Sequence, residues 1–200
     1  MLELIIIALS YMFGSIPFAL VIGKVFFKKD VRNYGSGNLG GSNAGRVLGK
    51  KIGITVILLD ASKALISTLI AGYLSRRFDL YIDLRYFAGL ACVIGHCYPV
   101  FASFKGGKAV STAAGLQIAI VPKFVLPGLV IFMLVLYKSK YVSLASIVTA
   151  TFIIVATFFM NISLTGKIIN IIVMALLIYR HKSNIGRLLN HTENKVTYLG

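Results

Sequence analysis

A series of long apolar runs restricts this chain to very few folds. A helix needs about 20 mainly apolar residues to cross a bilayer, and runs of this kind recur from one end of the sequence to the other. They cover residues 4–27, 52–74, 84–101, 110–121, 124–137, 142–160 and 168–179. We therefore predict an all-α integral membrane protein with about seven transmembrane helices.

The composition points to the same class. Hydrophobic residues make up 58% of the 200, which is too apolar for a soluble domain of this size. The first run lacks a basic leader and a small-residue cleavage site, so we predict a spanning helix there and not a signal peptide. The fourth and fifth runs are short and meet at Val121-Pro122-Lys123. This favours two helices joined at a proline over one broken or re-entrant pair. No internal repeat or linker is evident, and residues 1–200 are predicted to form one domain.

The positive charges are distributed unevenly between the two ends of the predicted helices. The formal net charge is +15. Fourteen cations fall in the loops on one side and in the C-terminal tail: Lys28, Lys29, Arg32, Arg46, Lys50, Lys51, Lys105, Lys108, Lys138, Lys140, Arg180, Lys182, Arg187 and Lys195. Five fall on the other side: Arg76, Arg77, Arg85, Lys123 and Lys167. Cytoplasmic loops carry the excess of Lys and Arg, so the N-terminus is predicted outside and the C-terminus in the cytoplasm.

The placement of these cations also narrows the class of partner. Nucleic acid is not expected, because the charges lie in short loops between bilayer-length apolar runs. Anionic lipid headgroups or an anionic substrate would both account for them.

The first loop on the cationic side is rich in glycine and small polar residues. It reads Gly-Ser-Gly-Asn-Leu-Gly-Gly-Ser-Asn over residues 35–43, followed by Arg46. Glycine lets backbone N–H groups converge on an anion, and the guanidinium suits phosphate or carboxylate. The spacing is not that of a P-loop. We predict an anion site formed by Ser36, Asn38, Gly40, Ser42, Asn43 and Arg46, with a flexible polar loop as the alternative.

A second anion site is predicted in the loop that follows the third run. Lys105-Gly106-Gly107-Lys108 directly precedes an apolar helix, whose N-terminus favours a phosphate. Simple anchoring of the helix by its cations is the alternative. His96 lies in an apolar stretch just before this loop, and we predict that it acts as an interior hydrogen-bonding group and not as a catalyst.

Two further sets of polar residues are candidates for supporting or catalytic roles. Asp60 and Lys63 lie inside the second run at helical i, i+3 spacing and are predicted to pair with each other. A role of Asp60 in also holding Arg46 or Lys108 in position is left open.

In the tail, His181, Asn184 and Arg187 share one helical face, with Glu193 just beyond. An interfacial amphipathic helix would show the same pattern. His181 is the best candidate for a general base, if the reaction needs one.

Several kinds of active site are excluded by what the sequence lacks. The chain has six acidic residues, and no pair of them has the spacing of a Mg²⁺ site. No HxxxxD pair and no Gly-x-Ser-x-Gly elbow occurs. The only cysteines, Cys92 and Cys97, have no CxxC or His/Cys partners, so neither a disulfide nor zinc is predicted. No metal or other cofactor is expected.

Four segments together resemble a known family, the bacterial acyl-phosphate:glycerol-3-phosphate acyltransferases of phospholipid biosynthesis. They are Gly14-Ser15-Ile16-Pro17, residues 35–43 with Arg46, residues 95–108, and His181-x-x-Asn184-Ile185-x-Arg187-Leu188-Leu189 with Glu193. Departures from the family pattern are small. Ser42 replaces a Thr, Ala109 and Ser111 replace a Gly and an Ala, and His191 stands where a Gly is usual.

The resemblance implies a multi-pass enzyme of the bacterial inner membrane with its active site facing the cytoplasm. The implied reaction moves an acyl group from acyl phosphate to the 1-hydroxyl of glycerol 3-phosphate, giving lysophosphatidic acid and phosphate. An acyl phosphate has a good leaving group, so neither a metal nor an acyl-enzyme is demanded, and positioning plus electrostatics suffice.

The two anion sites and the tail can be matched to this reaction. The acyl-phosphate head and the oxyanion are predicted to bind to Ser36, Asn38, Ser42, Asn43 and Arg46. The glycerol phosphate is predicted to bind to residues 105–108. The opposite assignment is equally open. His181 and Asn184 would orient the hydroxyl. Its proton would go to His181 or to a substrate phosphate oxygen. Glu193 is predicted to tie the tail to Arg187 or Arg46.

Two other classes of function stay open at this point. A small transporter or channel for an organic phosphate would also need several spans and a basic vestibule. An inactive lipid-binding scaffold would share the hydropathy pattern.

Overall fold

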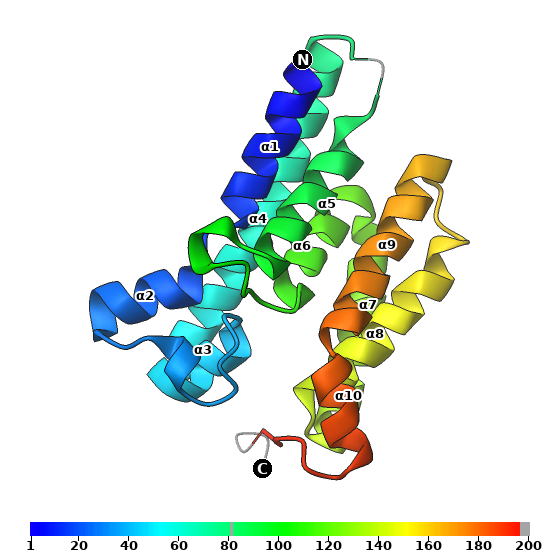
Figure 1. The fold of residues 1–200 in the computed structure, drawn as a ribbon. Coiled ribbons are helices and arrows are strands. Elements are labelled where there is room, and N and C mark those ends of the chain that lie inside the picture. Colours follow the sequence, from blue (N-terminus) through cyan, green and yellow to red (C-terminus); the bar gives the residue numbers. More distant parts are fainter. Residues whose placement is uncertain (81, 197–200) are drawn as a thin grey trace. The chain divides into compact units, whose positions relative to one another are not determined.

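The computed structural model describes residues 1–80 and 82–196, and over these residues the chain is helical with no strand. Figure 1 shows the helices in sequence order. The chain divides into two compact units, Met1–Ile120 and Val121–Gly200. Each unit is described separately below.

The first unit is a bundle organised around one long helix. Its α-helices are α1 (Leu2–Gly14), α2 (Phe18–Phe27), α3 (Gly41–Leu48), α4 (Lys50–Arg77), α5 (Leu84–Cys97) and α6 (Val110–Ile120). Short 3₁₀ turns, η1 (Val31–Asn33) and η2 (Val100–Ala102), lie in the loops. The 28-residue α4 contacts α1, α3, α5 and α6, and α1 also lies along α5 (Figure 1). Helix α4 is therefore the element that positions the rest.

The single helix predicted over residues 4–27 is wrong. The structure breaks it into α1 and α2, which are bent by 44° relative to each other. The break falls at Pro17, which has no N–H to donate and disfavours helical backbone at the residue before it. Pro17 then stands at the N-cap of α2.

Small residues allow the helices of the first unit to touch backbone to backbone. A Cβ on Gly14 would overlap the Cys92 carbonyl, which joins α1 to α5, and a Cβ on Gly115 would overlap the Ala61 carbonyl, which joins α6 to α4. Helices inside a membrane gain no hydrophobic effect from pairing, so close packing of this kind is their main source of association.

Up to residue 196, where the described part of the chain ends, the second unit contains four helices. They are α7 (Pro122–Ser139), α8 (Val142–Thr157), α9 (Leu164–Arg180) and α10 (Lys182–Leu189). Helix α8 contacts α7 and α9, and α10 packs on α8 and α9. Asn170 donates to the Thr157 hydroxyl (2.7 Å) inside this unit, a contact typical of polar side chains within apolar bundles.

Each of the seven apolar runs coincides with helix, but their number as spans is only partly supported. Three segments are long and apolar enough to cross a membrane by themselves: Lys50–Arg77, Leu84–Ala102 and Pro122–Ser139. Two bent pairs, α1 with α2 and α9 with α10 (51°), raise the number to five over the described residues. The remaining runs form the shorter apolar helices α6 and α8. Helix α6 ends at Ile120 and α7 begins at Pro122, so these two runs are separate helices. The count of seven spans and their orientation stay predictions.

Candidate active site

The glycine-rich loop at residues 35–43 is organised by one buried side chain. The Asn43 carboxamide oxygen accepts from the Ser36 N–H (2.8 Å), and its amide group donates to the carbonyls of Val31 (2.9 Å) and Tyr34 (3.3 Å). Gly35 has φ +58°, a conformation that glycine adopts at little cost. Asn43 thus folds the loop back on itself, while the Ser36 side chain remains at the surface.

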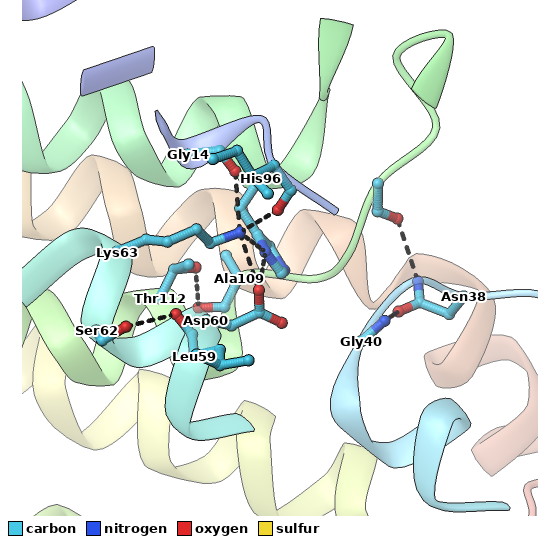
Figure 2. Close-up of polar contacts among 12 residues, drawn as sticks. Gly14, Asn38, Gly40, Leu59, Asp60, Ser62, Lys63, His96, Ala109 and Thr112 are labelled. Atoms are coloured by element: carbon cyan, nitrogen blue, oxygen red, sulfur yellow. Dashed lines mark hydrogen bonds and ion pairs between the residues drawn. The ribbon is translucent and has the colours of Figure 1, made fainter. Parts of the chain in front are cut away.

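A single asparagine connects this loop to the second glycine-rich loop. The amide of Asn38 donates to the Gly106 carbonyl (3.4 Å), and its oxygen accepts from the Gly40 N–H (2.9 Å), as Figure 2 shows around the labelled Asn38 and Gly40. These loops are 68 residues apart in sequence. The two predicted anion sites are therefore adjacent in the first unit.

The backbone of the loop that contains Lys105 is hydrogen-bonded to the end of α5 and to the turn η2. The Gly107 N–H donates to the His96 carbonyl (3.0 Å), and the Lys105 N–H donates to the Ala102 carbonyl (3.1 Å). Gly106 and Gly107 are buried, whereas Lys105 is exposed. A Cβ on Gly106 would overlap the same His96 carbonyl. Only glycine fits at these two positions, and the backbone then leads directly into α6.

These segments enclose a small pocket in the first unit. It is a narrow crevice: its empty volume of about 170 Å³ includes open solvent, and the space between its walls is too tight for a water molecule. The lining comes from the break between α1 and α2, from the first loop and from the second: Gly14, Ile16, Pro17, Leu39, His96, Pro99, Gly106 and Gly107. Three of the four segments that suggested a family from the sequence thus border one cavity.

A cluster of buried charges lies behind this pocket. Asp60 and Lys63 form the predicted pair (2.9 Å), and His96 Nδ1 approaches the same Asp60 oxygen (3.5 Å). Lys63 also donates to the carbonyls of Gly14 (3.0 Å) and Ile16 (2.9 Å). Figure 2 shows Lys63 between Gly14, Asp60 and His96. The carboxylate of Asp60 thus contacts both Lys63 and His96.

The tail residues form a second cluster, in the second unit, around one carboxylate. Glu193 accepts from Asn184 (2.6 Å) and Ser143 (2.8 Å) through one oxygen, and from Arg187 (2.7 Å) through the other. Burial raises the pKa of Glu193, but these hydrogen bonds and the charge of Arg187 outweigh burial and leave the pKa below its ordinary value. Nearby, His181 Nδ1 lies 2.8 Å from the Leu177 carbonyl.

That contact indicates which tautomer a neutral His181 ring adopts. A carbonyl oxygen can only accept, so Nδ1 carries the proton and the lone pair of the neutral ring is on Nε2. Helix α10 holds Asn184 and Arg187 on the face turned to Glu193. Neither cluster resembles a metal site, since the described residues gather no group of three or more His, Cys, Asp or Glu side chains.

Comparison with known proteins decides the family. The sequence model described as "Glycerol-3-phosphate acyltransferase" matches residues 4–191, nearly the whole chain. The chain belongs to the glycerol-3-phosphate acyltransferase family. Relatives of similar length carry the same name. Glycerol-3-phosphate acyltransferase 3 of Bacillus anthracis is 46% identical over 193 residues, 94% of this chain and 92% of that protein. A glycerol-3-phosphate acyltransferase of Macrococcus caseolyticus is 41% identical and covers 97% of both chains.

Solved structures give the same result for the fold. A crystal structure of PlsY (YgiH), described as an integral membrane glycerol 3-phosphate acyltransferase in its glycerol 3-phosphate form, matches with a TM-score of 0.91 and 39% identity. It covers 100% of this chain and 98% of that one. The lysophosphatidic acid form matches with a TM-score of 0.88 and 38% identity. The chain is thus an integral membrane acyltransferase with the fold of these enzymes.

The acyltransferase keeps its predicted site residues in two groups. The first unit contains the residues of both glycine-rich loops and the buried charged cluster: Ser36, Asn38, Gly40, Ser42, Asn43, Arg46, residues 105–108, Asp60, Lys63 and His96. The second unit contains the tail residues His181, Asn184, Arg187 and Glu193. Ser42 and Arg46 are exposed on α3. The carboxamide of Asn43 instead forms its hydrogen bonds within the loop.

One residue of the second cluster was not found from the sequence. Ser143 is buried at the first turn of α8 and donates to Glu193 across 50 residues. A lone serine at the start of an apolar run carries no distinctive pattern. The only available signal was its position beside the cationic loop at residues 138–140.

Proposed function

We propose that this acyltransferase takes its acyl group from acyl phosphate and transfers it to the 1-hydroxyl of glycerol 3-phosphate. The hydroxyl oxygen attacks the acyl carbonyl carbon, the bond from that carbon to the phosphate oxygen breaks, and lysophosphatidic acid and inorganic phosphate result. The leaving group is already good, so the proposed route uses neither a metal ion nor an acyl-enzyme intermediate. The observation that carries the proposal is the contact of Asn38 with Gly106, which joins two glycine loops beside exposed cations.

The two loops match the two phosphate-bearing substrates. In this proposal one phosphate and oxyanion site is formed by the first loop, through Ser36, Asn38, Gly40, Ser42, Asn43 and Arg46. Asn43 acts there through the loop backbone. Lys105 and Lys108 with the intervening glycines form the other. Converging backbone N–H groups and fixed cations stabilise an anion without reorganising during the reaction. Either loop can take either phosphate in this scheme.

The second cluster is proposed to handle the attacking hydroxyl. His181 and Asn184 orient it, and the proton leaves to His181 Nε2 or to a phosphate oxygen of a substrate. The Nδ1 contact with the Leu177 carbonyl suits the first option, because it places the basic lone pair on Nε2. Glu193 and Arg187 hold Asn184 in place and take no chemical step.

We further propose the location and topology of the enzyme. It spans the bacterial inner membrane seven times with its N-terminus outside, its C-terminus in the cytoplasm and its active site facing the cytoplasm. The excess of cations in the C-terminal tail and in the loops on the same side, fourteen against five on the other side, supports this orientation.

A reconstituted assay tests the reaction. Purified protein in detergent is given acyl phosphate, radiolabelled glycerol 3-phosphate and excess EDTA, and lysophosphatidic acid is measured. We expect Arg46→Ala and Lys105→Ala each to lower kcat/KM by about tenfold or more, the loss typical of a charged hydrogen bond. Lys51→Ala, which removes an exposed cation near Arg46 in sequence, is the matched control and should keep full activity. Full turnover in both site variants would reject the two-loop scheme, and product only with added metal would reject the metal-free route.

A further inference from the structure

Three ionisable side chains are buried together in the first unit, and the proposed reaction gives none of them a chemical step. Lys63 is 0% exposed, Asp60 1% and His96 7%. Charged groups inside a membrane protein are costly unless they are paired, and pairing by itself often contributes little to stability. A further role for the cluster is therefore worth seeking in what its members touch.

The contacts of Lys63 assign the protons of the cluster. An ammonium group has three protons, and Lys63 Nζ has three oxygen acceptors within 3.0 Å: the carbonyls of Gly14 and Ile16 and one Asp60 oxygen. All three protons are used by these acceptors. His96 Nδ1 lies 3.5 Å from both Nζ and that Asp60 oxygen. Since the Lys63 protons are already engaged, a hydrogen on Nδ1 is directed at Asp60, and the ion pair lies against this edge of the His96 ring.

The opposite edge of the same ring supports the second glycine loop. A Cβ on Gly107 would overlap His96 Nε2, so the ring lies directly against the Gly107 backbone. The His96 carbonyl also accepts from the Gly107 N–H (3.0 Å). The position of Gly107 is consequently set twice by one residue, once by the ring and once by the main chain.

The two walls of the pocket meet at this cluster. Gly14 and Ile16 line one side of the pocket, and Lys63 holds both of their carbonyls. His96 and Gly107 line the other side. Asp60 binds Lys63 and faces His96, so it is the link between the break in the first span and the glycine loop (Figure 2).

We propose that Asp60 and Lys63 are positioning residues for substrate: through His96 they hold the Gly106–Gly107 backbone in the conformation that binds a substrate phosphate. This inference rests on the proposed role of residues 105–108 in binding phosphate. It predicts that neutralising the cluster weakens the affinity for the one substrate held by this loop and leaves the other substrate's affinity unchanged.

A double substitution separates positioning from a merely structural ion pair. Removing one partner strands a buried charge and destabilises, whereas replacing both with apolar side chains is often neutral. Asp60→Leu combined with Lys63→Met should therefore remain folded by thermal unfolding in detergent. Thr68→Val is the matched control, because Thr68 is equally buried in α4 and its hydroxyl has no partner among the described residues.

The measurement compares the KM values of the two substrates. In the double variant we expect the KM of one phosphate-bearing substrate to rise by about tenfold or more, as for the loss of a charged contact, while the KM of the other and the unfolding temperature stay near those of Thr68→Val. Unchanged KM values in the folded double variant would overturn the inference, as would equal rises for both substrates.

A second measurement applies even if the double variant fails to fold. Asp60→Asn, His96→Ala and their combination form a double-mutant cycle. If Asp60 acts through His96, adding Asp60→Asn to His96→Ala raises the affected KM no further; additive increases overturn the inference. Direct titration of the unmodified enzyme with glycerol 3-phosphate separates this result from the proposed function. No binding there rejects the function itself, while equal binding of glycerol 3-phosphate in all variants together with an unchanged KM for acyl phosphate rejects only the positioning role.

Discussion

Gly107 shows how little freedom individual residues have around the pocket. Its N–H is bonded to the His96 carbonyl, and the space for a side chain is already filled by the His96 ring. Gly186, in α10, offers the opposite case, since nothing lies within 4 Å of a Cβ built there. The two glycines therefore make a matched pair for testing the packing of the site.

We expect Gly107→Ala to lower acyltransferase activity by about tenfold or more, because backbone displacement at a binding loop removes contacts worth a few kcal/mol. Gly186→Ala should keep activity and raise stability by about 0.5–1 kcal/mol, the usual gain for alanine in a helix. Activity and thermal unfolding in detergent measure both effects. Equal activity of the two variants would contradict the packing described for Gly107.

Glu193 gives the second residue cluster a defined response to pH. Its pKa is lower in the folded protein than its ordinary value of 4.5, so its ionised form stabilises the fold. That contribution is complete above pH 4.5 and is lost as the pH falls through the lowered pKa. Glu193→Gln should therefore unfold at a lower temperature than the unmodified enzyme at pH 7, and the difference should shrink on acidification below pH 4.5. A difference that is the same at every pH would show that the charge is not involved.

At the scale of elements, α3 is seated on α4 through glycine contacts. Gly53 on α4 faces Gly45 on α3, and a Cβ on Gly53 would lie 2.6 Å from the Gly45 Cα. A Cβ on Gly45 would instead lie 3.5 Å from the Gly53 Cα, an ordinary contact distance. Since α3 carries Arg46, this interface sets the position of a proposed substrate-binding cation.

Two alanine substitutions in this one interface should consequently behave differently. Gly53→Ala is expected to push α3 away from α4 and to reduce kcat/KM severalfold or more, because small displacements at a binding site are costly. Gly45→Ala should be tolerated. The assay for lysophosphatidic acid, run beside thermal unfolding, checks this. If Gly53→Ala were tolerated, the close contact between α3 and α4 would not be what sets the position of Arg46.

The elements themselves were largely predictable, and the contacts between loops were not. Hydropathy locates the apolar helices, because burial in a membrane requires whole runs of apolar residues. The bend at Pro17 was missed because an average over residues 4–27 does not register one proline, although the proline was visible. The contact of Asn38 with Gly106 depends on how α4 and α5 pack, which no local pattern encodes. Ser143 was missed for the same reason, whereas the pairing of Asp60 with Lys63 followed from their spacing alone.

At the scale of the whole molecule, the distribution of cations leads to a prediction of orientation. Green fluorescent protein fused at the C-terminus should fluoresce, since it folds in the cytoplasm, while alkaline phosphatase fused there should be inactive. Truncation after Arg77 with the same two reporters should give the reverse result. Matching results at both fusion points would contradict the predicted topology, because these points are predicted to face opposite sides of the membrane.

The position of Lys63 three residues after Asp60 also bears on how the chain enters the membrane during synthesis. When α4 enters the translocon, α5 has not yet been inserted, so His96 cannot contribute to the cluster. The Asp60–Lys63 pair lies within one helix, and each charge therefore brings its own counter-ion to the translocon. A lone ammonium at the centre of a nascent span costs about 2.5–3.5 kcal/mol. By pairing within α4, the enzyme lowers that barrier before α5 has been inserted beside it.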